Sequence, residues 1–469
     1  MMGGIEIVFF LFVLGGESDF VSALDPADYF KAREINPTTM KLTELATTPP
    51  TSGKAQIQQL LALRMIAEKA KDIRQADNFQ AVYKAVESVA NGQKAQDLQG
   101  FAKSYATKAY RALGAKIKVE PRNRPVESVR KEAFKWFPKG ATLVGSVDTR
   151  GITNENQSSQ DFLNNHFLKS MPQQGKNLFY EQIEKLGNVR VDRYSFAWVE
   201  DPQGGGSGKI FMRVTGKANH DWILAVFEQQ RQFELVKSQR RFRGRKISLL
   251  SARFGPSMGF VGDSDWIMAG YERGQNGIDV VKEALQIRSS KLPNVLAGPL
   301  GKKLATVSPK TGALLTGTLP LGAQRELNQG TPLQIRDFPK QFMVEVTDEK
   351  KNYTVKATGQ FGTEEAAKNF VNDANTALQF ATTALQLVKN NPPPFPAPVP
   401  NWGKLVDGGV AALKTIKLTP KGSSVNGTGQ APKALVTNVT KFAGAMTGLS
   451  YRVERDFRKE RKIEELKER

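Results

Sequence analysis

The sequence predicts an α+β protein: a small N-terminal helical bundle, then repeated strand–strand–helix (ββα) units with antiparallel or mixed sheets covered by helices on one face. Three four-residue stretches support the repeats, because each closes the second of two strand-like runs and precedes a helical pattern. They are Thr215-Gly216-Lys217-Ala218, Thr358-Gly359-Gln360-Phe361 and Thr428-Gly429-Gln430-Ala431. We expect the glycine of each stretch to end its strand with a backbone torsion that other residues avoid.

A helical periodicity over residues 54–115 supports the bundle, and Asn91-Gly92 separates its second segment from its third. Before it, residues 24–53 are a polar lead-in that we expect to be mostly extended, and after it residues 116–140 are a basic linker with three prolines. The segments QQLLALRMIAEKA and LQGFAKSYATKAYRAL resemble HEAT-like helical repeats. That resemblance implies stacked helical hairpins.

Residues 141–390 are predicted to form the α+β repeat domain, because pairs of alternating apolar and polar runs flank polar or Gly-rich turns. A long helix capped by Thr363 follows the second pair. A Pro-rich linker (391–403), a smaller ββα unit (404–450) and a charged helical tail (451–469) complete the chain. The predicted strands are Tyr194–Val199 with Ile210–Thr215, Phe342–Val346 with Tyr353–Thr358, and Thr415–Thr419 with Val425–Gly429, and a related unit spans Ile247–Phe254, Met258–Val261 and Trp266–Gly270 before a helix at Ile278–Ile287.

Composition restricts the chemistry of the 469-residue chain. Lys and Arg number 67 against 46 Asp and Glu, a formal net charge of +21, which favours nucleic acid, anionic polysaccharide or anionic lipid as partners. Because both signs are interspersed, a merely soluble basic surface is the alternative. The absence of cysteine excludes disulfides, zinc–thiolate sites and thiol nucleophiles. His166 and His220 lie in no ligand-spaced pair, so we expect neither a metal site nor a cofactor.

The first 23 residues raise the question of export. The apolar run Ile7–Leu14 is too short to span a bilayer, so no integral membrane span is expected, and Val21-Ser22-Ala23 before Leu24 has the small-residue pattern of a signal-peptidase site. This pattern favours a signal segment at residues 1–23 and an exported protein, periplasmic, envelope-bound or secreted. Against it, no Lys or Arg precedes the run, and Glu17 and Asp19 lie near the cleavage region. The alternative is a buried N-terminal strand or helix in a cytoplasmic protein.

Motifs for catalysis are weak. Gly208-Lys209 and Gly301-Lys302 lack the remaining residues of a phosphate-binding loop, and no serine lies in a nucleophile elbow, so no catalytic residue is assigned. A hydrolase that uses only carboxylates is the least favoured hypothesis, because nothing in the spacing of the acidic residues requires them to converge. The candidates are Asp192, Glu200, Asp201, Asp263 and Asp265.

The densest basic cluster surrounds Phe242 and is the best sequence candidate for a polyanion-binding site. Arginine beside an aromatic ring can contact phosphates and stack on bases. The alternative is a solvated loop between a helix and a strand. The cluster consists of Arg240, Arg241, Arg243, Arg245 and Lys246.

The segment MGFVGDSDWIMAGYERGQNGIDVVKEAL, taken with the N-terminal apolar run, resembles large uncharacterised bacterial extracytoplasmic proteins built from strand–strand–helix units. The resemblance covers Ala141 to Leu387 and transfers no activity and no functional residue. It favours a non-enzymatic binding or scaffold protein of the bacterial cell envelope, whose basic face meets an anionic polymer or a protein partner. An intracellular nucleic-acid-associated protein is the alternative, supported by net charge and by the cluster around Phe242.

Overall fold

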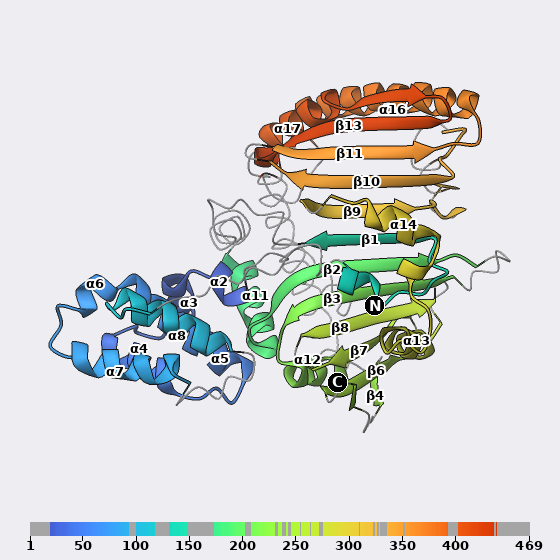
Figure 1. The fold of residues 1–469 in the computed structure, drawn as a ribbon. Helices are drawn as coiled ribbons and strands as arrows, with labels where there is room; N and C mark the ends of the chain where they lie inside the picture. Colours follow the sequence, from blue (N-terminus) through green and yellow to red (C-terminus); the bar gives the residue numbers. More distant parts are fainter. Residues whose placement is uncertain are drawn as a thin grey trace, which may run out of the picture.

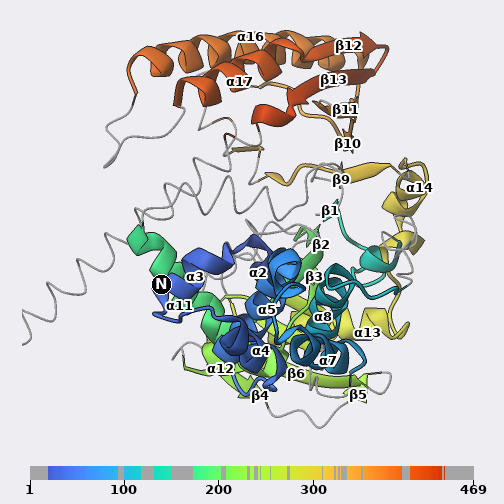
Figure 2. The ribbon, with the colours of Figure 1, turned by 90° about the vertical axis from the view of Figure 1, so that its left-hand side faces the viewer.

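The fold was obtained as a computed structural model, shown in Figures 1 and 2. The structure describes residues 19–92, 100–117, 131–148, 173–201, 208–229, 233–236, 241–242, 245–253, 255–262, 264–271, 275–308, 310–321, 324–325, 328, 335–349, 352–392, 402–435 and 438. Within them, 13 strands form one sheet in the order β12-β13-β11-β10-β9-β1-β2-β3-β8-β7-β6-β4, with β5 also paired to β6. All neighbouring strands are antiparallel, and helices precede the sheet, which confirms the predicted α+β class.

The elements follow one another along the chain in three groups. The first is helical: α2 (Phe20–Ala23), α3 (Pro26–Ala32), α4 (Thr39–Thr47), α5 (Gly53–Glu68), α6 (Ala70–Ile73), α7 (Phe79–Ala90) and α8 (Phe101–Ala112). The second is β1 (Leu143–Asp148), α11 (Gln173–Leu186), β2 (Arg190–Val199), β3 (Lys209–Lys217), α12 (His220–Glu228), β4 (Phe233–Val236), β5 (Arg241–Phe242), β6 (Arg245–Ala252), β7 (Ser257–Val261), β8 (Asp265–Tyr271), α13 (Ile278–Arg288) and α14 (Pro299–Ala305). The third is β9 (Thr311–Gly317), β10 (Gln341–Asp348), β11 (Asn352–Gln360), α16 (Glu364–Asn390), α17 (Trp402–Lys414), β12 (Lys417–Lys421) and β13 (Ser424–Pro432).

We call the face of the sheet that carries the N-terminal helices the front face; it is turned away from the viewer in Figure 1, where α13 and α14 lie nearer. Side chains of β2, β3, β6, β7 and β8 on this face, among them Tyr194, Val214 and Trp266, join the helices α2–α8, α11 and α12 in the largest hydrophobic core. Gly53 of α5 approaches α11 closely, since a Cβ there would lie 2.4 Å from the carbonyl oxygen of Glu184. The helical unit is therefore packed tightly against the sheet.

The back face carries α13, α14 and part of the predicted basic linker. Phe134, Trp136 and Phe137 are buried there against Val144, Ala197 and Phe211 of the central strands. Residues 131–140 are thus a packed part of the domain, because their aromatic side chains cover apolar strand residues. Helices consequently cover both faces around the central strands, where the sequence predicted one.

The C-terminal end of the sheet has a small core of its own on the front face. Phe361, Ala367 and Val371 lie against Val425 of β13 and Leu418 of β12, and α16 and α17 run side by side over these strands (Figure 1). The sequence predicted α16 from its apolar stripe, and Thr363 caps it as expected, its Oγ1 accepting a hydrogen bond from the Ala366 N–H at 3.1 Å. It did not predict α17, which occupies the end of the Pro-rich linker and the start of the unit that follows.

The prediction that residues 24–53 are mostly extended is wrong, because α3 and α4 form in this segment. Their local signals are present in the sequence. Asp25 caps α3, accepting hydrogen bonds from the Ala27 and Asp28 N–H groups, and Pro26 occupies the first helical position. Thr38 caps α4 in the same way, through the Lys41 N–H. Four prolines in this stretch therefore mark helix starts and connections between short helices.

The predicted hairpins are confirmed in all three units, as β2–β3, β10–β11 and β12–β13, and the related unit is β6–β7–β8 with α13. The expected role of the glycines is wrong, however. Gly216, Gly359 and Gly429 are not among the glycines with positive φ. The structure instead requires Gly216 for a close backbone approach, because a Cβ there would lie 1.9 Å from the carbonyl oxygen of Arg190.

Candidate functional site

Between the two front-face cores lies a stretch of sheet whose apolar side chains belong to neither. We call this the front strip. Its members are Val147 of β1, Ala313 and Leu315 of β9, Phe342, Val344 and Val346 of β10, and Val355 and Ala357 of β11, all half-buried and outside the three hydrophobic cores. Among the described helices, none lies over these strands on the front face (Figure 2).

Strand register places the members of the front strip on one face. Val147 pairs with Tyr194, which belongs to the front core, and with Ala313 on its other side. Leu315 pairs with Val344, which pairs in turn with Ala357. The opposite face of β11 is polar and exposed at Lys356, Thr358 and Gln360. Alternation thus gives β11 one apolar side and one polar side, whereas the opposite side of β10 carries Met343, which packs against the back-face core.

The front strip continues onto β2 through two aromatic residues. The Phe196 ring lies across Gly145 of β1, where a Cβ would be only 2.1 Å from the ring. The next front-facing residue is Trp198, which pairs with Leu143. Its indole Nε1 is buried and has no hydrogen-bond partner within the described part of the chain. Phe196 and Trp198 thus extend the apolar surface of the front strip from β1 onto β2.

Charged side chains mark the two ends of the front strip. Lys310 precedes β9 at one end, Lys340 precedes β10 at the other, and both are exposed. Near Lys310, the ammonium of Lys433 pairs with Asp348 and lies 5.5 Å from the ring centroid of Tyr353. Burial, followed by the charge of Asp348, raises the pKa of Tyr353 to about 12, so this phenol is neutral at physiological pH.

The structure leaves the predicted polyanion site untested. Arg241 begins the short β5 and pairs with Lys246 of β6, while Phe242 pairs with Arg245. The backbone thus forms a tight hairpin, whose side chains lie outside the described part of the structure, as do Arg240 and Arg243 altogether. Polyanion binding by this cluster stays a prediction.

The candidate carboxylates are held in separate contacts. Asp192 pairs with Arg190 at 2.9 Å, Asp265 pairs with Arg213 at 2.6 Å, and Glu200 accepts a hydrogen bond from the Leu321 N–H at 3.3 Å. Asp265 pairs with Thr215 at one end of β3, whereas Glu200 follows Val199, which pairs with Lys209 at the other end of β3, so these two do not share a site. Asp263 lies outside the described residues.

The described histidine is a core residue. His220 packs edge-on against Phe260 and Trp266, with ring centroids 5.1 and 5.6 Å away, and its side chain is buried. His166 lies outside the described residues. Among the residues that are described, no group of three or more His, Asp or Glu is arranged to hold a metal ion. None of the described helices combines the length and apolar composition that crossing a bilayer needs.

Two ion pairs lie buried on the back face of the central strands, and Asp265 is the one of their four members that the sequence indicated as a candidate. Arg193 of β2 bonds Asp148 of β1 at 2.5 Å, and both side chains are almost fully buried. On the adjoining strands Arg213 of β3 bonds Asp265, and its guanidinium lies 4.8 Å from the centroid of Trp136.

Further charges surround the second buried pair. The Arg213 guanidinium also donates to the Glu132 carbonyl at 3.1 Å, and the Glu132 carboxylate accepts from Arg288 at 2.9 Å. Burial lowers the pKa of Arg213, and the charge of Asp265 opposes that change. Since these charged groups compensate one another, we assign them to the stability of the sheet rather than to chemistry.

Comparison with known proteins gives no identity for the chain. No family model and no curated protein matches it. Similar solved structures include three crystal forms of TP0453, which are 10%, 11% and 10% identical and cover 70%, 66% and 66% of this chain and 99%, 97% and 96% of that one. The TM-score is 0.33 for each, so the likeness supports no argument about fold or function.

Proposed function

We propose that this chain is a binding protein whose front strip receives an acidic amphipathic helix of a protein partner. The observation that carries the proposal is the set of half-buried apolar side chains on β1, β9, β10 and β11 that belong to no core. Apolar surface of this kind gains about 25 cal/mol for each Å² that a partner removes from water. The cell envelope is the proposed location, on the strength of the apolar run Ile7–Leu14.

The dimensions of the front strip favour a helix as its occupant. Four neighbouring strands span about 14 Å, since strands in a sheet are about 4.8 Å apart. An α-helix with its side chains is about 10–12 Å wide, so one helix fills the strip. The same arrangement already exists at both ends of this face, where helices of the chain cover the neighbouring strands (Figure 1).

Charge favours an acidic helix. The chain carries a net charge of +21, and the exposed Lys310 and Lys340 lie at opposite ends of the front strip. Carboxylates on the partner helix would meet these ammonium groups at the rim, which raises the rate of association and sets the orientation.

Binding of a synthetic helix tests the proposed function. The probe is a fluorescein-labelled 18-residue peptide with leucines on one helical face and glutamates on the other, followed by fluorescence anisotropy with the full chain. We expect Val344→Asp to weaken its binding by at least tenfold, because a charge would be buried beneath the peptide. Thr358→Asp, on the exposed back face of β11, should bind like the parent. Val344→Thr keeps the side-chain shape and should weaken binding less.

Matched peptides separate this proposal from simpler explanations. A peptide of the same composition with its leucines scattered should bind at least tenfold more weakly, and one with lysine in place of glutamate should bind more weakly still. Equal binding of the acidic and basic amphipathic peptides would contradict the assigned charge. No binding at 100 μM peptide, or unchanged binding by a folded Val344→Asp variant, would reject the site. Thermal melting of each variant shows whether it is folded.

A further inference from the structure

Residues 19–24 cross the predicted signal-peptidase site, yet they lie in the middle of the largest core. Phe20, Val21 and Leu24 are buried there with side chains of α5, α8, α11 and β2. The Phe20 N–H donates to the Val189 carbonyl at 3.0 Å, and the Val21 N–H donates to Asn188 Oδ1 at 3.0 Å. Asp19 forms a β-bridge with Arg190 at the start of β2. The segment therefore joins the helical unit to the sheet.

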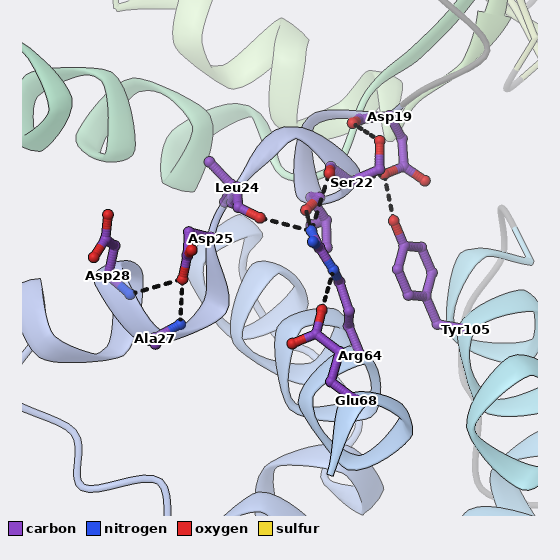
Figure 3. A network of polar contacts seen from close by, with 10 residues as sticks. Asp19, Ser22, Leu24, Asp25, Ala27, Asp28, Arg64, Glu68 and Tyr105 are labelled. Carbon is purple, nitrogen blue, oxygen red and sulfur yellow. Dashed lines mark hydrogen bonds and ion pairs between the residues drawn. The ribbon is translucent and has the colours of Figure 1, made fainter. Parts of the chain in front are cut away.

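Arg64 of α5 holds the backbone of this segment. Its Nη1 donates to three carbonyl oxygens, those of Val21 at 3.2 Å, Ser22 at 3.0 Å and Leu24 at 2.6 Å (Figure 3). Its Nε pairs with Glu68 at 2.9 Å, which fixes the guanidinium from the other side. A charged donor shared by three carbonyls satisfies the end of the short α2, whose last carbonyls have no partner within the helix.

Asp19 closes the segment at its other end. Its Oδ1 caps α2 by accepting the Ser22 N–H at 2.8 Å, and the same oxygen accepts the Tyr105 hydroxyl of α8 at 2.6 Å. The Ser22 hydroxyl donates back to the Asp19 carbonyl at 2.7 Å. Burial, followed by the charge of Asp19, raises the pKa of Tyr105 well above its usual value, so the phenol keeps the proton it donates. Figure 3 shows the carboxylate between α2 and Tyr105.

We propose that residues 19–24 are a clasp retained in the folded protein, and that removal of any leader occurs on the N-terminal side of Asp19. The bond between Ala23 and Leu24 is flanked by Ser22, 2% exposed, and Leu24, 0% exposed. Cleavage there would remove the buried Phe20 and Val21, the Asp19 cap and two of the three carbonyls that Arg64 binds, those of Val21 and Ser22. Gly16 and Ser18, which follow the apolar run and lie two positions apart, have the small-residue spacing that a peptidase site needs.

The N-terminus of the native protein tests where processing occurs. The protein would be purified from cell fractions, and its N-terminal peptide identified by mass spectrometry. We expect every form to contain Asp19, with the processed form beginning between Gly15 and Asp19. A native protein beginning at Leu24 or later would overturn the proposal.

Engineered chains test what the clasp does. A chain beginning at Asp19 should melt at the same temperature as the full chain, whereas one beginning at Leu24 should expose α5 and α8 to limited proteolysis at least tenfold faster. In the full chain, Arg64→Met keeps most of the apolar stem and removes the three carbonyl contacts, and we expect its Tm to fall by about 5 °C or more. The control is Lys71→Met, which removes a positive charge at an exposed position of α6. The proposal would be overturned if the two shortened chains and the two substituted chains all had the same melting temperature and the same rate of proteolysis.

Discussion

Replacing Gly216 by alanine is expected to lower the free energy of unfolding by about 3 kcal/mol, within the range that forced overpacking reaches. A Cβ at this position would lie 1.9 Å from the carbonyl oxygen of Arg190, which is backbone and cannot turn aside. The approach is close because β2 has a register shift between Val191 and Arg193, opposite Gly216. The Gly216 N–H also donates to the Ser264 carbonyl at 2.8 Å, so the strand is fixed from its other side as well.

The other two glycines of the repeated signature are the controls for this prediction. A Cβ at Gly359 would lie 3.2 Å from Phe361 Cε2, and one at Gly429 would lie 3.3 Å from Ile416 Cγ1. Both neighbours are side-chain atoms that can move slightly, so we expect Gly359→Ala and Gly429→Ala to change stability by about 1 kcal/mol or less. Urea unfolding of the three variants measures the difference. Equal losses in all three would show that the register shift of β2 is not the cause.

The three Thr-Gly stretches show how much of the fold the sequence predicts. The alternation of apolar residues and the polar turns correctly predicted each hairpin, since these signals depend on residues close together in the chain. The role of each glycine was not predictable, because it depends on the strand next to it. Gly216 is opposed by the irregular β2, whereas Gly359 lies opposite Phe342, where the pairing of β10 with β11 is regular.

The long-range pairings of the sheet could not be predicted for the same reason. Strand β1 pairs with β2 on one side and with β9 on the other, so Val147 lies between Tyr194 and Ala313. No local signal indicates that β9 joins the two hairpin regions into one sheet. The buried Phe134 and Trp136 were missed because the basic residues and prolines around them are typical of a linker.

The candidate site was missed because its sequence signal is that of any amphipathic strand. Phe342, Val344 and Val346 recur at every second position, with Met343 and Glu345 between them, which predicts a strand with a buried face. Sequence cannot tell whether a helix of the same chain covers that face. The structure shows that the described helices cover β12 and β13 and the strands from β2 onward, and that the front strip lies between them.

The buried pair on the back face supports the largest prediction for stability. Arg193 is 1% exposed and Asp148 is 3% exposed, so neither charge is solvated by water. We expect Asp148→Ala to destabilise the protein by about 3–5 kcal/mol, because it leaves a buried guanidinium without its carboxylate. The matched control is Lys389→Met, which breaks the exposed ion pair between Lys389 of α16 and Asp407 of α17. We expect this variant to lower the free energy of unfolding by about 0.5 kcal/mol or less. Urea unfolding with a constant m value measures both.

A double variant distinguishes the loss of the pair from the loss of either side chain. Asp148→Val with Arg193→Met replaces both charges with apolar groups, and we expect it to be more stable than Asp148→Ala, since no uncompensated charge remains. If the losses in free energy of unfolding from the two single variants add up in the double variant, each side chain stabilises the sheet independently, which contradicts the proposed role of the pair.

The neighbouring Ser146 and Ser195 hydroxyls, 3.3 Å apart across the same two strands, provide a second test. If the ion pair fixes the register of β1 on β2, Ser195→Ala should lower the free energy of unfolding much less than Asp148→Ala does. Ser195→Ala removes one neutral hydrogen bond and leaves both charges paired.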